Sequence, residues 1–154
     1  MYKTHKAFTM LELIMVIAII GILSAVALPK FAASRTDAEL VKAKSIVSAV
    51  RLGIATARQS LILSGNFTPV TFLTNNTGTN VAIFDAIEGD ITTPVLEYPI
   101  RSCETATSSG CWITTNLTTY TYRMPLPGTV NFILTNSKFV CQTPANANCQ
   151  LLTQ

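Results

Sequence analysis

The distribution of apolar and polar residues divides the chain into three stretches, and each stretch predicts a different structure. The first is apolar without a break: residues 13–28 contain no ionisable side chain, and Glu12 is the single one in residues 8–29. A helix rises about 1.5 Å per residue, so residues 8–28 form a helix long enough to cross a hydrocarbon core of about 30 Å. We therefore predict a transmembrane helix over residues 8–29.

The second stretch, residues 30–64, has the pattern of an amphipathic helix. Apolar side chains recur at alternating steps of three and four, and the basic residues fall outside this stripe. The stripe consists of Leu40, Ala43, Val47, Val50, Ile54, Ala57 and Leu61. Because Gly commonly ends helices, the Ser-Gly-Asn sequence at 64–66 predicts the end of one continuous helix that begins at about Phe8. Gly21 and Pro29 weaken this helix and allow it to bend.

The third stretch, residues 65–154, is rich in Thr, Asn, Gly and Pro and contains short β-type runs. Turn clusters separate the clearest runs, and this pattern predicts an antiparallel meander with strands at 112–115, 120–124, 130–134 and 139–142. Residues 70–73 and 81–84 are expected to be short strands or loop segments. The alternation within 120–124 gives that strand two faces, one of which can pack on the helix stripe. The predicted fold class is α+β, a long N-terminal helix packed against a small antiparallel β-sheet.

The composition argues against a soluble enzyme. Of the 154 residues, 49% are hydrophobic and 12% are charged, whereas a soluble domain carries about 25% charged residues. The one histidine is His5, so the rest of the chain lacks the base of Ser-His-Asp and Cys-His catalysis. The sequence also has no phosphate-binding Gly loop. We predict neither an enzyme nor a bound cofactor.

Three acids, Asp85, Glu88 and Asp90, are candidate calcium ligands. Their spacing lacks the D-x-D-x-D-G pattern of a calcium loop, so a solvated turn is favoured over a calcium site. No metal site is predicted.

Four cysteines, Cys103, Cys111, Cys141 and Cys149, follow the helix in two pairs with seven residues between the members of each pair. Metal-binding cysteines are usually closer together, so the pattern indicates a disulfide-containing C-terminal region made in an oxidising compartment. Three connectivities are possible. The turn composition of both enclosed segments favours neighbour pairing, and a nested pairing across the sheet remains open.

Two opposing signals bear on the orientation of the membrane helix. More Lys and Arg residues follow the helix closely than precede it, which by the positive-inside rule puts the C-terminal side in the cytoplasm. The cysteines require an oxidising compartment on that side, and we give them more weight. Cleavage after Ala27 as a secretory signal is a further alternative, but the apolar run is longer than in such signals.

Residues 7–31 (AFTMLELIMVIAIIGILSAVALPKF) closely resemble the N-terminus of type IV pilins and of the pseudopilins of type II secretion and DNA-uptake systems. The shared features are a short basic leader, Phe8 followed by Thr, Glu12 as the fifth residue after the leader, and helix-weakening residues in the apolar run. The resemblance implies that a prepilin peptidase cuts between Ala7 and Phe8 and methylates the new amine of Phe8. The family's leader usually ends in Gly, so Ala7 is expected to slow processing without moving its site.

The resemblance also implies a role for Glu12. A carboxylate in an apolar membrane helix is unfavourable unless it is paired or lies near the interface, and a tolerated charge near the interface is the alternative role. In a filament of bundled helices, the Phe8 ammonium of an incoming subunit can pair with Glu12 of a docked one. At about 4 Å and an effective dielectric near 20, this attraction is about 4 kcal/mol before desolvation is subtracted. Such a pair would fix the axial register of otherwise featureless helices.

By resemblance, we predict a structural subunit of a type IV pilus-like filament, a pilin or pseudopilin, that serves protein secretion, DNA uptake or surface adhesion and motility. Residues 1–7 form the leader, 8–29 the membrane and assembly helix, 30–64 the amphipathic helix, and 65–154 a periplasmic or extracellular domain. Expected partners are other pilin or pseudopilin subunits, the prepilin peptidase, the inner-membrane assembly platform and the membrane. The expected location is the bacterial inner membrane, with a single pass and the C-terminal domain in the periplasm, and then a periplasmic or surface filament. The alternative is a membrane-tethered periplasmic binding domain that does not polymerise.

Charge makes nucleic acid an unexpected partner for the C-terminal domain. Residues 65–154 carry three basic and five acidic side chains, whereas phosphate binding needs clustered cations. Residues 30–58 carry six basic side chains and two acidic ones. We expect these basic residues to complement the acidic domain where subunits meet.

Overall fold

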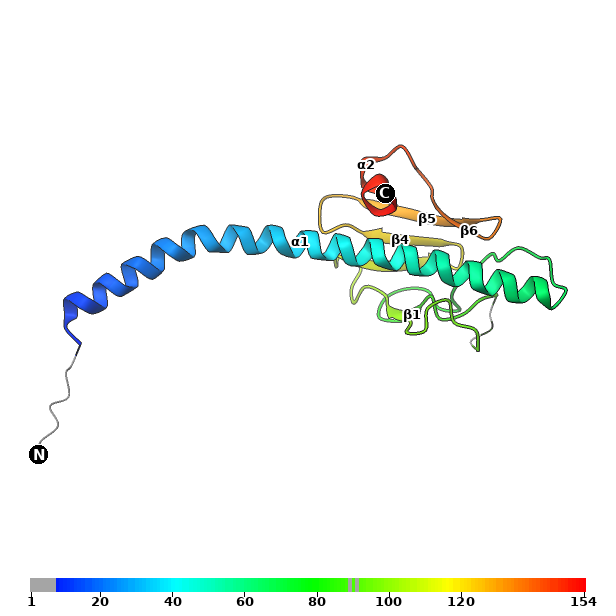
Figure 1. Cartoon of the computed structure of the whole chain (residues 1–154), viewed down its shortest axis with the longest axis horizontal. Coiled ribbons are helices and arrows are strands. Elements are labelled where there is room, and N and C mark those ends of the chain that lie inside the picture. The colour runs from blue at the N-terminus through cyan, green and yellow to red at the C-terminus, as the bar shows by residue number, and fades with distance from the viewer. Residues whose placement is uncertain (1–7, 89, 91) are drawn as a thin grey trace, which may run out of the picture. The chain divides into compact units, whose positions relative to one another are not determined.

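The structure, a computed structural model, describes residues 8–88, 90 and 92–154. It contains two compact units: the first unit ends at Arg35, and the second unit runs from Thr36 to Gln154. In chain order (Figure 1), the elements are α1 (Met10–Leu63), β1 (Ala82–Ile83), β2 (Ile100–Arg101), β3 (Cys111–Asn116), β4 (Thr119–Arg123), β5 (Thr129–Thr135), β6 (Lys138–Cys141) and α2 (Ala147–Thr153). A long helix followed by short antiparallel strands confirms the predicted α+β class.

Helix α1 begins with an N-cap that was not predicted from the sequence. The Thr9 side-chain oxygen accepts a hydrogen bond from the Glu12 amide (3.2 Å), and the Thr9 carbonyl accepts one from the Leu13 amide (3.1 Å). Thr9 is therefore the N-cap, and Glu12 is the third helical residue. For this reason the helix begins at Met10 and not at Phe8.

The end of α1 lies where the sequence predicted it. Gly65 adopts a positive φ of 83°, its amide donates to the Ile62 carbonyl (3.0 Å), and the Asn66 amide donates to the Leu61 carbonyl (2.8 Å). This is the Schellman arrangement, in which a left-handed residue satisfies the last carbonyls of a helix. Glycine adopts that conformation without the steric penalty of a Cβ atom.

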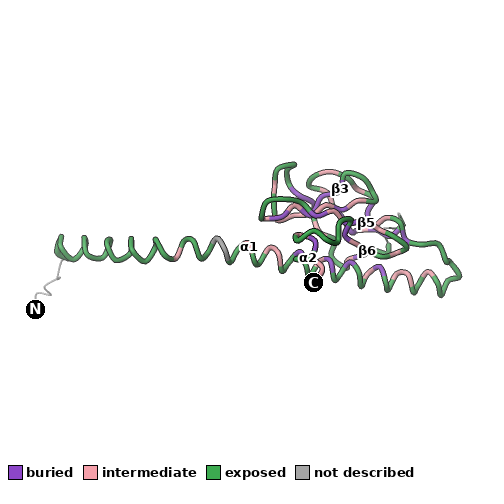
Figure 2. Tube along the Cα trace, turned by 90° about the horizontal axis from the view of Figure 1, so that it is seen from above, coloured by how far each residue is buried: buried purple, intermediate pink, exposed green. Residues whose placement is uncertain are grey.

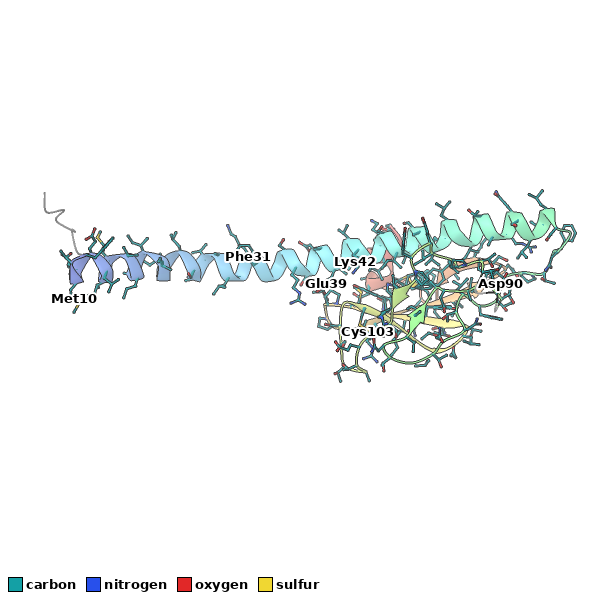
Figure 3. All side chains as sticks on the ribbon, turned by 90° about the horizontal axis from the view of Figure 1, so that it is seen from below. Met10, Phe31, Glu39, Lys42, Asp90 and Cys103 are labelled. Carbon is teal, nitrogen blue, oxygen red and sulfur yellow. A yellow bond between two sulfur atoms is a disulfide. The ribbon has the colours of Figure 1, made fainter. Side chains whose placement is uncertain are left out.

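The described part of the first unit consists of Phe8, Thr9 and the N-terminal part of α1, and most of its described residues are exposed (Figure 2). Met10 is 79% exposed and Phe31 is 73% exposed, and both project away from the helix in Figure 3. Within the described residues, α1 is the one helix that is long and apolar enough to cross a membrane. Such a surface is unfavourable in water, so it requires a lipid or protein environment.

The second unit contains a four-stranded antiparallel sheet in the order β3-β4-β5-β6. The ends of all four strands agree with the predicted meander to within one residue. The register places Trp112 opposite Tyr122 and Tyr120 opposite Phe132, so large side chains meet across neighbouring strands. A separate two-stranded sheet joins β1 to β2.

Residues 70–73, expected to be a short strand or a loop segment, form a loop segment. Their amides bond to side chains and not to a neighbouring strand: the Val70 amide donates to the Ser137 hydroxyl (2.9 Å) and the Leu73 amide to the Tyr120 hydroxyl (2.7 Å). The Thr71 amide donates to the Glu88 carboxylate. Side-chain oxygens thus accept the hydrogen bonds of these amides, which a neighbouring strand would otherwise accept.

The core of the second unit lies between the α1 stripe and the sheet. Ala43, Val47, Val50 and Ile54 are buried, while Leu40, Ala57 and Leu61 pack partly buried against them, as the stripe predicted. Six aromatic rings face the stripe and contact one another: Phe84, Trp112, Tyr120, Tyr122, Phe132 and Phe139. Most of these rings come from β3 to β6, so the alternation of each strand places its large side chains on the helix-facing side.

Helix α2 was not predicted from the sequence. Asn146 caps it by accepting a hydrogen bond from the Asn148 amide (2.8 Å). Two residues three positions apart, Cys149 and Leu152, are buried. The signal in the sequence was an Asn N-cap before this short apolar pair, but seven residues are too few for a helical period to stand out.

Gly53→Ala is expected to destabilise the second unit by about 1–3 kcal/mol, because a Cβ atom there would meet a packed backbone group. It would lie 2.1 Å from the Val95 carbonyl oxygen. Thermal unfolding of the full chain in detergent, followed by Trp112 fluorescence, measures the effect. Gly21→Ala is the matched control, because a Cβ at Gly21 meets nothing within 4 Å. Equal melting of both variants would contradict the close approach of Val95 to α1.

Candidate assembly site

The segment singled out by the sequence lies at the start of α1. Ala7 lies outside the described residues. Phe8 is 76% exposed, and Glu12 is exposed in the first turn of the helix. Within the described part of the chain, the Glu12 carboxylate makes no hydrogen bond or ion pair. The side chain is exposed and has no partner among those residues.

The helix itself favours a negative charge at Glu12. Free amides at a helix N-terminus carry partial positive charge, and an acid in the first turn is stabilised by about 0.3–1 kcal/mol at exposed positions. Its neighbours Leu11 and Leu13 are 77% and 55% exposed. An exposed carboxylate surrounded by exposed apolar side chains offers a single polar contact on a surface that otherwise packs through apolar groups.

Gly21 and Pro29 lie within α1, and the backbone is helical through both positions. A Cβ added at Gly21 would meet no atom of the described residues within 4 Å, so no contact among them requires glycine there. Pro29 lacks the amide that would donate to the carbonyl four residues earlier. Both residues weaken the helix locally, and the bend that we expect from them remains a prediction.

The four cysteines form two disulfides in the C-terminal region, Cys103–Cys111 and Cys141–Cys149, with Cα–Cα distances of 5.2 and 6.3 Å. This is the neighbour pairing among the connectivities that the sequence left open. The first bond closes the loop before β3. The second ties α2 to the end of β6. In the chain-entropy account, each closed loop of this size stabilises the fold by about 2–3 kcal/mol.

The three acids considered for calcium do not converge on one point. Asp85 accepts hydrogen bonds from Thr74 (2.6 Å) and Asn76 (2.8 Å), whereas Glu88 accepts from Thr71. The hydroxyl of Thr92 donates to Asp90 and lowers the pKa of that carboxyl, and the Thr92 amide adds to this effect. Each acid thus accepts hydrogen bonds from a different set of residues. The described residues contain no cluster of acids, His or Cys that could hold a metal.

Two buried tyrosines of β4 use their hydroxyls to bond backbone carbonyls outside that strand. The Tyr120 hydroxyl donates to the Leu117 carbonyl (2.7 Å), and the Tyr122 hydroxyl donates to the Glu39 carbonyl (3.2 Å). Burial raises the pKa of Tyr122 to about 12 from its usual 10.0, and the negative charge of Glu39 contributes to the rise. Burial also raises the pKa of Tyr120. In the folded protein both tyrosine side chains are therefore neutral phenols.

The second unit is expected to lose stability as the pH rises from 10 to 12. Below pH 10 the folded and unfolded chains both keep the Tyr122 proton, but above it the unfolded chain loses this proton first, which favours unfolding. Tyr122→Phe should make this loss less steep, at a cost of about 0.5–1.5 kcal/mol near neutral pH for the missing hydrogen bond. Urea unfolding at several pH values measures both effects. The exposed control Tyr98→Phe should follow the wild-type profile, and an unchanged slope in Tyr122→Phe would contradict the account.

Two basic residues of α1 have partners in their own chain, which sequence reasoning did not foresee. The Arg51 side chain donates to the Phe139 carbonyl (3.2 Å). The Arg58 guanidinium donates to the carbonyls of Phe67 (2.7 Å) and Thr68. These bonds fix a β6 residue and the segment after α1 to the helix. No local pattern reveals them, because their acceptors are backbone carbonyls whose positions depend on the complete fold.

Comparison with known proteins adds information about the N-terminal part of the chain. Residues 2–28 match the prokaryotic N-terminal methylation motif. The chain is 43% identical over 63 residues to a fimbrial protein of Pseudomonas aeruginosa, and this aligned stretch covers 41% of this chain and 38% of that protein. It is 40% identical over 58 residues to a fimbrial protein of Moraxella nonliquefaciens, which covers 38% of each chain. The chain thus spans well under half the length of these curated relatives, and no solved structure matches it significantly.

Proposed function

From the methylation motif and the fimbrial relatives, which support a type IV pilin family for this chain, we propose that it is a structural subunit of a type IV pilus-like filament. The observation that carries the proposal is the start of α1. There the motif coincides with an exposed apolar helix whose single carboxylate, Glu12, has no hydrogen-bond or ion-pair partner within the described residues. A surface of this kind is suited to burial among copies of itself, because only one polar group has to find a partner.

In this proposal the chain is made with residues 1–7 as a leader. Residues 8–29 hold it in the inner membrane, residues 30–64 continue the helix, and residues 65–154 form a domain in the periplasm. A prepilin peptidase cuts between Ala7 and Phe8 and methylates the new amine. The inner-membrane assembly platform then transfers the subunit into a filament that serves secretion, DNA uptake or surface adhesion and motility.

Glu12 has two roles in this assembly. Within the subunit its amide donates to the Thr9 cap, and its side chain lies in the first turn of α1, which favours a negative charge. Between subunits its carboxylate pairs with the Phe8 ammonium of a neighbour. Helices that pack through apolar side chains alone can slide along one another, and one ion pair selects a single register. Gly21 and Pro29 let α1 adapt its curvature as it moves from lipid into the filament.

The N-terminus of the mature protein tests the proposal. We expect the mass of the chain from the membrane fraction to correspond to a start at methylated Phe8. Ala7→Gly should leave the site unchanged and speed processing, because glycine is the residue that the family's peptidase usually meets there. A start after Ala27 would instead identify a cleaved secretory signal and would exclude a filament subunit anchored by residues 8–29.

A further inference from the structure

A groove in the second unit lies between α1 and the segment that precedes β2. It has a volume of about 870 Å³, and its lining includes Leu52, Gly53 and Thr56 of α1 together with residues 93–97. Apolar side chains make up much of the wall, and Leu52 is 69% exposed. Because Gly53 has no side chain, the Val95 backbone approaches the helix closely there.

All charges of this groove are negative. Among the described lining residues, Glu88, Asp90 and Glu97 are acidic and none is basic; Asp90 lies in the loops beside α1 in Figure 3. Hydroxyl and amide groups of the second unit bind the first two carboxylates. Glu97 has no hydrogen-bond or ion-pair partner within the described residues. Tyr98, next to it, is 81% exposed, and a carboxylate beside an aromatic ring attracts a cation by charge and by the ring face.

The opposite flank of α1 is basic. Lys44, Arg51 and Arg58 follow at steps of seven residues, about two helical turns, so they lie on one side of the helix. Lys138 of β6 and Arg51 line the same hollow of about 330 Å³, whose described lining contains apolar side chains and no acid. Asp37 lies on this side of α1 as well, two turns before Lys44.

The acidic groove and the basic flank cannot meet within one copy. Arg51 and Gly53 are two residues apart, which corresponds to about 200° around a helix axis. Figure 1 shows β6, where Lys138 lies, on one side of α1 and β1 with its loops on the other. A second copy whose basic flank faces the acidic groove of the first can bring its Lys138 to Glu97 of the first.

We propose that the acidic groove of one copy receives the basic flank of a second copy, with Glu97 and Tyr98 contacting Arg51 and Lys138 of that second copy. The inference rests on the proposed function and gives it a lateral contact between subunits. Each copy presents one groove and one basic flank, so the contact is heterologous. Such contacts continue from copy to copy and lead to an open filament when they do not close into a ring. The apolar walls of groove and hollow add buried area, and the charges select the pairing.

Carbodiimide crosslinking of the full-length protein in its membrane tests this contact, because the reagent joins a carboxylate and a lysine that touch. We expect a dimer band whose digest contains an amide between Glu97 and Lys138. Glu97→Lys and Lys138→Glu should each abolish this product, because carbodiimide cannot join two amines or two carboxylates, and each variant also places like charges opposite one another. The double variant should restore a crosslink between the same two positions, which a misfolded variant could not do.

Glu104→Lys is the matched control, because it makes the same charge change at an exposed acid in the Cys103–Cys111 loop. It should leave the dimer product unchanged. If filaments form and depend on Glu12 while positions 97 and 138 give no crosslink and the two single variants assemble normally, the lateral contact is overturned and the filament function stands. If the crosslink forms in membranes and no filament is recovered, the contact stands and the proposed function fails.

Discussion

Glu12→Gln is expected to leave the protein inserted, processed and folded, and to lower its amount in the filament fraction about tenfold or more. Glutamine keeps the size of the side chain, and Thr9 caps the backbone amide of residue 12, which the substitution does not change, so the start of α1 is preserved. A neutral side chain inserts into lipid at least as easily as a carboxylate. What disappears is the charge that meets the Phe8 ammonium. A tenfold fall corresponds to about 1.4 kcal/mol, well below the attraction of about 4 kcal/mol before desolvation.

The measurement compares the membrane pool and the filament pool of wild type and variant. Thr9→Ala is the matched control, because it removes the hydroxyl that caps the Glu12 amide and keeps the charge. It should weaken the first turn by about 1 kcal/mol and still assemble. Glu12→Lys should assemble less than Glu12→Gln, because it repels the incoming amine. Equal partition of wild type and Glu12→Gln would show that the carboxylate is not an assembly contact.

Phe132→Ala is expected to destabilise the second unit by about 3–5 kcal/mol, a large part of the roughly 5–15 kcal/mol that stabilises a typical domain. Phe132 is fully buried. Its ring stacks on Phe139 at 4.8 Å and lies 5.5 Å from Trp112. Removing it leaves a cavity between β5 and the helix stripe and also breaks the aromatic contacts.

Urea unfolding followed by Trp112 fluorescence measures this loss. Phe67→Ala makes the same chemical change at a ring that is 70% exposed. Its effect should stay within about 0.5 kcal/mol, as for most surface substitutions. Similar losses in both variants would mean that the aromatic cluster does not determine the stability of the second unit.

The sequence predicted those parts of the fold that depend on local periodicity. The helix stripe from Leu40 to Leu61 and the four strands of the main sheet all appear in the structure, because burial of one face imposes a regular spacing. The Thr9 N-cap also has a local signal, since Thr followed three residues later by Glu precedes the apolar run.

The remaining features depend on groups that are distant in the sequence. Leu73 bonds to the Tyr120 hydroxyl, and Arg51 bonds to the Phe139 carbonyl. Neither bond can be recognised from the spacing of residues along the sequence. The disulfide pairing was open for the same reason, because four cysteines alone do not distinguish three connectivities. The groove beside Gly53 could not be foreseen either, since it depends on how closely the Val95 backbone approaches α1.

Polymerisation through the N-terminal helix is the central claim, and crosslinking within residues 8–29 tests it most directly. A photoreactive side chain placed at one exposed apolar position of this segment, such as Ile22, should couple neighbouring copies when intact cells are irradiated. A filament subunit gives a ladder of dimers, trimers and higher multimers, and Glu12→Gln shortens that ladder. A membrane-tethered domain that does not polymerise gives a monomer band at every position tested, and that result would contradict the account.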